Sequence, residues 1–309
     1  MIRISVVIPL YNKEKEISDT LKSVINQSYP ADEIIVVDDG STDNSADIVK
    51  GFSDNRIKLI QQKNSGESQA RNTGIAAASN EYIALIDADD LWEEDFLLEI
   101  KALIERFPNA VFYSTGTYRI DEYGRKIKNK TPLSSDFFGI VNNFYKAFSF
   151  SNYGLVFSSS VCIRKSIFLR GYRFPVGEKR GADLYYWLVL STLGDLAFSG
   201  RNLSIYKMNA TNRSISPSTE GIIAYNIKWF YTTPSLKELQ NYKGIKKFIR
   251  KNSLINAYYL ALNKDIASLK KTIYFIKQYD FLLFLMLLPA FFMPRFFLRI
   301  IKHIRRKFR

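Results

Sequence analysis

Three aspartates within four positions follow an apolar run and are the clearest chemical signal in the chain. The run Tyr82–Ile86 has the composition of a buried strand, and Asp87, Asp89 and Asp90 come directly after it. Carboxylates this close repel one another and raise one another's pKa unless a cation lies between them. A hard divalent ion with oxygen ligands suits such a group, so we expect a metal site here. The alternative is that these acids cap a helix starting near Trp92–Asp95.

A second acidic turn, Asp38–Asp43, also follows a buried strand, at Ile34–Val37. It could equally be a loop that caps the next helix. A third candidate is Arg71, in a helix expected across roughly 67–78, because a guanidinium can hold a phosphate with two hydrogen bonds. A solvated surface position is the alternative for this arginine. Each of these features has both a functional and a purely structural interpretation. A shared position in the fold would favour the functional one.

Strands and helices alternate through the first 113 residues. Apolar runs at 4–10, 34–37, 57–60, 82–86 and 110–113 predict strands. Helical spacing recurs between them, first at Ile17, Leu21, Val24 and Ile25, with Asn12 as a plausible cap. Such alternation predicts an α/β fold with a mostly parallel sheet covered by helices on both faces. Ligands bind at the carboxyl edge of such sheets, and both acidic turns are expected there.

Beyond residue 114 the alternation ends. Short β-like pieces at 156–163, 196–198 and 203–206 surround a helix beginning near Ala182, and residues 220–231 and 245–278 have helical patterns. We therefore expect a catalytic domain at 1–218, with a nucleotide-binding half (1–113) and an acceptor half (114–218). C-terminal helices (219–280) and an apolar and basic tail (281–309) follow.

The composition excludes several kinds of chemistry. Cys162 is the only cysteine and His303 the only histidine among 309 residues. An internal disulfide, a cysteine-based zinc site and serine–histidine–acid catalysis in the body of the protein are therefore excluded. The N-terminus shows no secretory pattern, so a cytoplasmic protein is expected.

The net charge of +14 is concentrated in one part of the chain. Residues 1–242 carry 28 basic and 28 acidic side chains, whereas residues 243–309 carry 16 basic and 2 acidic ones. The positive charge therefore belongs to the C-terminal region, and the body is neutral.

The motifs together resemble glycosyltransferase family 2, whose members have a GT-A fold and invert the anomeric configuration. The resemblance covers about residues 3–216 and rests on four segments in the family's order and spacing. They are SVVIPLYN (5–12), VDDGSTD (37–43), ARNTG (70–74) and DADD (87–90).

The resemblance implies roles for individual residues. Asp87 and Asp89 would be the two acids of the DXD motif, Asp89 the direct metal ligand, and Asp90 could share either role. The cofactor would be Mn²⁺ or Mg²⁺, which neutralises the departing nucleoside diphosphate as a Lewis acid. Other residues would bind the nucleotide-sugar donor, expected to be a UDP-sugar: Pro9, Tyr11, Asn12, Asp39, Arg71, Asp87, Lys207 and Arg213.

The family pattern also implies a catalytic base. Asp183 falls at the position of the residue that deprotonates the acceptor hydroxyl, although Ala182 replaces the acid that usually precedes it. Glu178 is a second candidate, and Asp183 could instead only cap a helix. The Gln-x-x-Arg-Trp motif of processive members is absent, which favours addition of a single sugar.

The tail indicates where the protein works. Residues 281–294 carry no charge, and as a helix they would span about 21 Å, less than the roughly 30 Å of a hydrocarbon core. Basic residues follow, so residues 281–309 are expected to bind the inner face of the cell membrane. A core helix with a solvated basic end is the alternative. Membrane binding suits a saccharide acceptor linked to a lipid such as a polyprenyl diphosphate, as in cell-surface polysaccharide synthesis (O-antigen, capsule or lipopolysaccharide).

Two other functions are compatible with parts of the sequence. A nucleotidyltransferase with a GT-A-like fold would show a Gly-rich basic loop after the first strand, and Tyr11–Glu14 is not one. A nucleic-acid-binding protein would fit the pI near 9.6. The neutral body and the aliphatic tail argue against that function, so no nucleic-acid partner is expected.

Overall fold

The computed structural model describes residues 1–151, 155–178, 180–211, 224–238, 242–262 and 265–292. The chain divides into two compact units, each described here by itself. The first contains residues 1–177 and 186–213, and the second contains residues 178–185 and 214–309.

In its described residues, the first unit is built on one mixed sheet of ten strands in the order β3-β2-β1-β4-β9-β6-β10-β5, with β7 beside β6 and β8 beside β10. The strands are β1 (Ile4–Leu10), β2 (Glu33–Asp38), β3 (Ile57–Gln61), β4 (Tyr82–Leu85), β5 (Leu91–Trp92), β6 (Phe112–Ile120), β7 (Lys126–Lys128), β8 (Phe138–Ile140), β9 (Val161–Arg164) and β10 (Leu196–Lys207). Strands β3, β2, β1 and β4 run parallel to one another. The predicted α/β class is confirmed.

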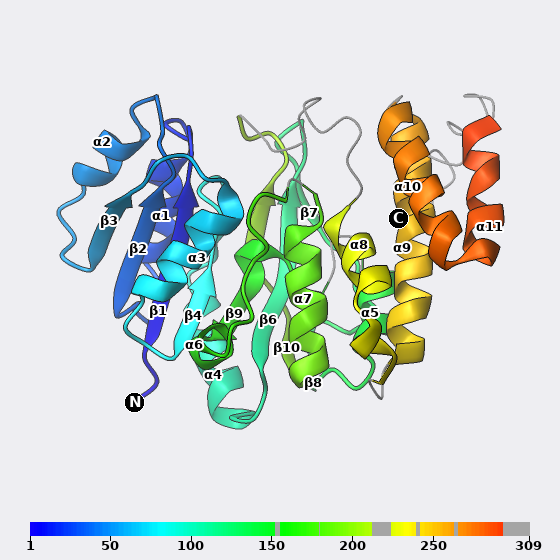
Figure 1. The fold of residues 1–309 in the computed structure, drawn as a ribbon. Helices are drawn as coiled ribbons and strands as arrows, with labels where there is room; N and C mark the ends of the chain where they lie inside the picture. Colours follow the sequence, from blue (N-terminus) through cyan, green and yellow to red (C-terminus); the bar gives the residue numbers. More distant parts are fainter. Residues whose placement is uncertain (152–154, 179, 212–223, 239–241, 263–264, 293–309) are drawn as a thin grey trace. The chain divides into compact units, whose positions relative to one another are not determined.

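Helices cover both faces of this sheet (Figure 1). Those of the first half are α1 (Ile17–Ile25), α2 (Ser45–Lys50), α3 (Glu67–Ala77) and α4 (Phe96–Arg106), and those of the second half are α5 (Phe144–Phe150), α6 (Lys165–Leu169) and α7 (Ala182–Leu193). Alternate residues of β1, from Ile4 to Leu10, join the core formed with α1, α2 and α4. Because both faces are covered, every residue of β1 and β2 is buried.

Helix α3 packs on the opposite face because Gly74 has no side chain. A Cβ at Gly74 would lie 2.4 Å from Val7 Cγ1, closer than carbon atoms pack, and 3.2 Å from Val37 Cγ2, which is a tight contact. The glycine of the ARNTG motif thus seats α3 against β1 and β2. This contact fixes the position of Arg71, which lies one turn earlier on the same helix.

The second half of the sheet differs from the sequence prediction. The run predicted as a strand at 156–163 contains a 3₁₀ turn, η1 (Ser158–Ser160), and then β9, which runs antiparallel between β4 and β6. The two pieces predicted at 196–198 and 203–206 form one strand, β10, with irregular register between them. Asn12 is not the cap of α1, because Glu16 occupies that position.

The second unit is helical. It contains the start of α7, then α8 (Tyr225–Thr232), the 3₁₀ turn η3 (Pro234–Glu238), α9 (Tyr242–Leu262), α10 (Ile266–Tyr279) and α11 (Phe281–Phe292). The stretch predicted as helical at 245–278 thus holds two helices, and Asp265 caps the second by accepting the Ser268 N–H. Ala257, Leu260, Leu269, Ile273 and Ile276 join residues of α11 in one core. None of the described helices has the length and apolarity needed to cross a bilayer.

Candidate active site

The carboxyl ends of β1, β2 and β4 meet at one edge of the sheet. Strand β1 pairs in parallel with β2 on one side and with β4 on the other, so the turns after these strands are neighbours. The turn Asp87–Asp90 follows β4, and Asp38–Asp43 follows β2. This is the edge at which parallel sheets bind ligands.

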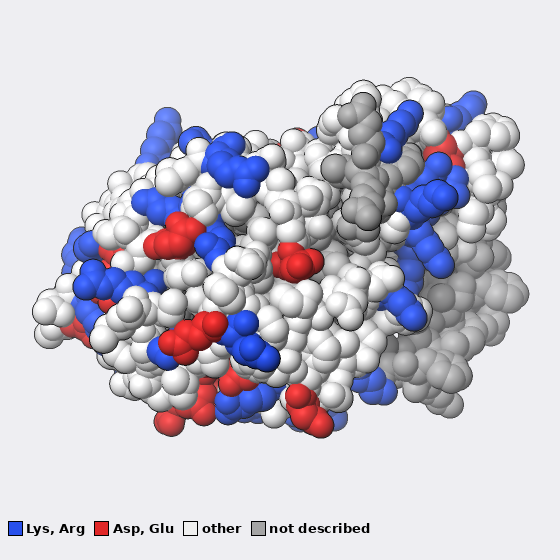
Figure 2. All heavy atoms as spheres, turned by 90° about the horizontal axis from the view of Figure 1, so that it is seen from below, with Lys and Arg blue, Asp and Glu red and all other residues white. Residues whose placement is uncertain are grey.

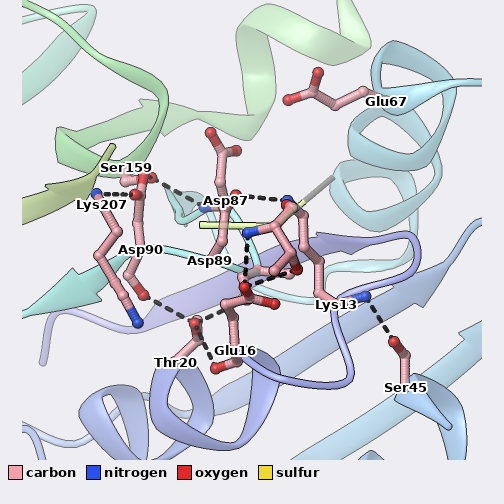
Figure 3. Close-up of polar contacts among 12 residues, drawn as sticks. Lys13, Glu16, Thr20, Ser45, Glu67, Asp87, Asp89, Asp90, Ser159 and Lys207 are labelled. Carbon is pink, nitrogen blue, oxygen red and sulfur yellow. Dashed lines mark hydrogen bonds and ion pairs between the residues drawn. The ribbon is translucent and has the colours of Figure 1, made fainter. Parts of the chain in front are cut away.

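Asp89 is joined to the loop after β1. Lys13 Nζ lies 2.7 Å from Asp89 Oδ2 and 2.5 Å from the carbonyl oxygen of Thr211, to which it also donates (Figure 3). Glu16, at the start of α1, accepts hydrogen bonds from the N–H and hydroxyl of Thr211, each at 2.8 Å. Burial and the neighbouring charge of Asp87 raise the pKa of Asp89, which the Lys13 ammonium partly offsets. The segment after β10 is thus tied to the acidic turn through Lys13 and to the start of α1 through Glu16.

Asp87 is joined to α3. Arg71 Nη2 donates to Asp87 Oδ1 at 2.7 Å and also pairs with Glu67 on its own helix. The guanidinium is buried and lies 5.4 Å from the ring centroid of Phe174. Asp87 keeps about a fifth of its side chain exposed, so a ligand can reach it.

Asp90 has a different place from its two neighbours. Its side chain is fully buried and accepts hydrogen bonds from the Ser159 hydroxyl at 2.5 Å and from the backbone N–H of Lys207 at 3.0 Å. The same Ser159 hydroxyl accepts the Asp87 N–H, and Figure 3 shows Asp90 directed toward Ser159 and Lys207. Burial, with the charges of Asp87 and Asp89, raises the pKa of Asp90 well above its usual range. Its contacts hold the turn onto η1 and β10.

The second acidic turn is held by neutral donors. Asp39 is buried and accepts hydrogen bonds from Gln62 Nε2 at 2.7 Å and from the N–H groups of Ser65 and Gly66 at 2.9 and 2.8 Å. Asp38 likewise accepts from the Ser41 N–H and from Gln61. This turn therefore shapes the loop that leads into α3.

The remaining residues predicted to bind the donor lie beside this turn. Pro9 is buried in β1, and Tyr11 follows the strand with 40% of its surface exposed. Asn12 has a positive φ of 51° and accepts the Thr42 N–H at 2.8 Å, while its own N–H donates to Ser41. Lys207 contributes its backbone N–H to Asp90, and Arg213 lies outside the described residues.

The two candidate bases differ in their partners. Asp183 lies in the first turn of α7, and its Oδ1 accepts the Leu184 N–H at 2.8 Å. Glu178 accepts two hydrogen bonds from Lys228 Nζ, at 2.9 and 3.0 Å. Both acids belong to the second unit. Glu178 forms an ion pair with Lys228, whereas none of the described residues forms an ion pair with Asp183.

The oxygen ligands that the acidic turn offers suit a divalent cation that is bound partly by the substrate. Within the described ranges, no three acidic, histidine or cysteine side chains surround a common point where an ion could sit. Asp87 and Asp89 are two carboxylates at one rim, and their mutual repulsion contributes to the raised pKa of Asp89. Magnesium-type ions are commonly held by one or two carboxylates together with substrate phosphates. Asp87 and Asp89 therefore fit that mode of binding. In the structure, which contains protein alone, their partners are Arg71 and Lys13.

Sequence reasoning missed Lys13, Glu16, Thr20 and Ser159. Thr20 lies on α1, and its hydroxyl donates to the carbonyl oxygens of Ala88 and Asp90, at 3.0 and 2.9 Å. Ser159 lies about seventy positions after the turn it supports and reaches it only because β9 is inserted beside β4. A polar residue on the apolar face of α1 was the one available signal for Thr20.

A family model described as Glycosyl transferase family 2 matches residues 5–168. The chain belongs to glycosyl transferase family 2. This match contains all four motifs on which the sequence resemblance rests, and it confirms that resemblance. Asp183, Lys207 and Arg213 lie beyond the matched range of the family model.

Curated bacterial glycosyltransferases resemble parts of the chain. An uncharacterised glycosyltransferase of Rickettsia bellii is 31% identical over 68% of this chain and 29% of its own length. Glycosyltransferase GlyA of Streptococcus pneumoniae is 33% identical over 59% of this chain and 27% of its own length. The putative teichuronic acid biosynthesis glycosyltransferase TuaG of Bacillus subtilis is 37% identical over 42% of this chain and 50% of its own length. The chain thus spans less than a third of the first two relatives.

Among solved structures, that of S. aureus TarS residues 1–349 in complex with UDP-GlcNAc has a TM-score of 0.75 with this chain. The match covers 94% of this chain and 87% of TarS 1–349, at 18% identity. At that identity the comparison establishes the GT-A-like fold of this family 2 member.

Proposed function

We propose that this chain is an inverting glycosyltransferase that moves one sugar from a UDP-sugar to a saccharide acceptor. The observation that carries the proposal is the turn Asp87–Asp90 at the carboxyl edge of the sheet in a member of family 2. The UDP-GlcNAc in the TarS complex supports a uridine nucleotide as the donor.

The donor would lie over the two acidic turns. Tyr11 and Asn12 frame the nucleotide beside Asp39, with Pro9 under them, and Asp39 holds the loop through Ser65 and Gly66. Asp89 and Asp87 would hold Mn²⁺ or Mg²⁺, which supplies Lewis-acid stabilisation of the departing diphosphate. Lys13 and Arg71 are the cations closest to these acids and would pair with phosphate oxygens once the acids bind the metal. Lys207 and Arg213 would add to this charge.

The acceptor needs a base on the face opposite the leaving group. Its hydroxyl oxygen forms the new bond to the anomeric carbon while the bond from that carbon to the phosphate oxygen breaks, which inverts the configuration. We assign the removal of the acceptor's hydroxyl proton to Asp183, because Glu178 already forms an ion pair with Lys228. An aspartate that takes a proton in this way contributes roughly 10²–10⁴-fold in rate.

The acceptor is proposed to be linked to a lipid, such as a polyprenyl diphosphate, at the cytoplasmic face of the membrane. Residues 1–218 would carry out the transfer, with helices at 219–280 and the tail at 281–309 toward the membrane. The name of TuaG, a putative teichuronic acid biosynthesis enzyme, supports a role in cell-surface polysaccharide synthesis.

A panel of sugar nucleotides tests the donor assignment. The protein is incubated with each donor, with and without Mn²⁺, and thermal stabilisation and release of free nucleoside diphosphate are recorded. We expect one UDP-sugar to stabilise the fold and to release UDP slowly only with the metal. Formation of a sugar nucleotide from a sugar phosphate and a nucleoside triphosphate would instead identify a nucleotidyltransferase.

Two matched variants test the base. Asp183→Asn should lower sugar transfer about 10²–10⁴-fold while donor binding stays unchanged, because only proton transfer is lost. Glu178→Gln is the control and should retain most of the activity. A reversed order of effects would assign the base to Glu178.

A further inference from the structure

Helix α11 has two apolar faces, and the described residues cover one of them. Leu283, Leu287 and Ala290 are buried against α9 and α10. The other face exposes Phe281, Leu282, Leu285 and Met286, each by 45–61% of its surface. The positions 281, 282, 285 and 286 share one side of a helix. Among the described residues, α11 therefore packs on α9 and α10 with one face and presents an apolar ridge (Phe281, Leu282, Leu285 and Met286) with the other.

This helix is too short to cross a bilayer. Its twelve residues span about 18 Å, against a hydrocarbon core of roughly 30 Å. A helix anchored along one side by its own protein can still lie in the membrane–water interface with the other side in the acyl region. Tyr274 and Tyr279 of α10 are also largely exposed, and tyrosine is enriched at that depth of a membrane.

The charge around this ridge favours an anionic partner. Helices α9 and α10 carry seven lysines and one arginine. The acids at their ends are neutralised, because Asp280 pairs with Arg250 and Asp265 pairs with Arg180. Lys277 Nζ lies 5.5 Å from the ring centroid of Phe284, whose ring packs against that of Phe281 of the ridge. Figure 2 shows basic side chains predominating over α9–α11 on the face that it presents.

The sequence after α11 continues this charge. Residues 293–309 carry seven basic and no acidic side chains. A second copy of the chain would bring the same positive charge against itself, whereas an anionic headgroup layer would neutralise it. The combination of an apolar ridge and surrounding cations is the one that interfacial helices present to anionic membranes.

We propose that Phe281, Leu282, Leu285 and Met286 form a docking surface for an anionic lipid bilayer, on which α11 lies parallel to the membrane plane. Its use for a lipid-linked acceptor rests on the proposed function, but lipid binding itself does not.

Vesicle flotation tests this surface on the full chain. The probes are vesicles of phosphatidylcholine alone and of phosphatidylcholine mixed with phosphatidylglycerol. We expect the protein to float with the mixed vesicles, less so at high salt, and to stay behind with neutral ones. The triple variant Leu282→Ser/Leu285→Ser/Met286→Ser should lower the apparent affinity for mixed vesicles about tenfold or more.

A matched variant controls for the loss of exposed apolar side chains. Leu98→Ser/Leu169→Ser/Val176→Ser changes three exposed apolar residues of the first unit, and it should float like the wild type. The wild type, the α11 variant and the control variant should have the same circular dichroism and the same metal-dependent UDP release in solution. Loss of UDP release in all three would count against the proposed function and would leave the lipid-binding result unaffected.

Three results would overturn the proposal: wild-type flotation of the α11 variant, equal binding to both kinds of vesicle, or a dimer in solution that this variant dissociates.

Discussion

The two acidic turns look alike in sequence but are stabilised in different ways. Both follow a buried parallel strand at the same edge of the sheet. In the turn after β2, Asp38 and Asp39 accept hydrogen bonds from backbone N–H groups and glutamine amides. In the turn after β4, Asp87 and Asp89 face Arg71 and Lys13, and burial and mutual repulsion raise the pKa of Asp89.

The difference suggests that the carboxylates after β2 have a structural role, whereas those after β4 can exchange their present partners for a metal ion. Hydrogen bonds from a fixed backbone hold a carboxylate and its loop in one geometry. A lysine or arginine side chain can move away when a divalent ion and a phosphate arrive and offer each charge a new partner. We therefore expect the turn after β2 to govern the stability of the nucleotide loop and the turn after β4 to govern metal-dependent chemistry.

The largest effect is expected at Asp89. Asp89→Ala should lower sugar transfer by about a thousandfold, or ~4 kcal/mol of transition-state stabilisation, because the carboxylate that we propose as a metal ligand is lost. Circular dichroism should show an intact fold. Full activity at saturating donor and metal would show that this turn has no part in the chemistry.

Asp39→Asn should act on stability instead. Its amide would place an N–H₂ group against the N–H of Ser65 or Gly66, leaving a buried donor unpaired at a cost of about 2 kcal/mol. Denaturant unfolding measures this loss, with the exposed Asp19→Asn as control. Mn²⁺ affinity without donor should not change, and a large change would contradict the division of roles.

Lys13→Met tests whether Lys13 and a metal ion compete for the Asp89 carboxylate. Without the ammonium group, the donor-free protein should bind Mn²⁺ about tenfold more tightly, because Asp89 loses its competing cation. Titration followed by the electron paramagnetic resonance of free Mn²⁺ measures this. Lys15→Met, at an exposed lysine two positions away, is the control. Unchanged affinity in Lys13→Met would mean that Lys13 and the metal do not compete.

The smallest effect is a pH dependence at Asp43. Burial opposes ionisation, but hydrogen bonds from Ser45 and from the Glu14 N–H outweigh it and lower the pKa of Asp43. A lowered pKa stabilises the fold above the unfolded value of about 3.9, and this contribution is lost as the pH falls through the folded value. Asp43→Asn should cost about 0.5 kcal/mol near neutrality and nothing in strong acid. Unfolding measured across that range tests the sign.

The first half of the fold was predictable because its signals are local. Apolar runs at 4–10 and 34–37 give β1 and β2, and their order places both acidic turns at one edge. The antiparallel β9 and the joined β10 were not predictable, because pairing between strands far apart in sequence leaves no periodic pattern.

The candidate site follows the same division. The acids and Arg71 could be found from motifs, whereas their partners could not. Lys13 reaches Asp89 from a loop, and Ser159 reaches Asp90 because β9 lies beside β4, and both contacts depend on tertiary structure. A lysine in a loop has no local mark that tells which carboxylate it will meet.

The missing side chain at Gly74 links the interior of the protein to its chemistry. A methyl group there would press on Val7 and Val37, and the helix would have to tilt or shift away from the sheet. Arg71 would move with it, away from Asp87. A substitution at this buried position is therefore expected to lower sugar transfer by displacing Arg71, and a mutational screen would then group residue 74 with the candidate site residues although it lies in the packing between α3 and the sheet.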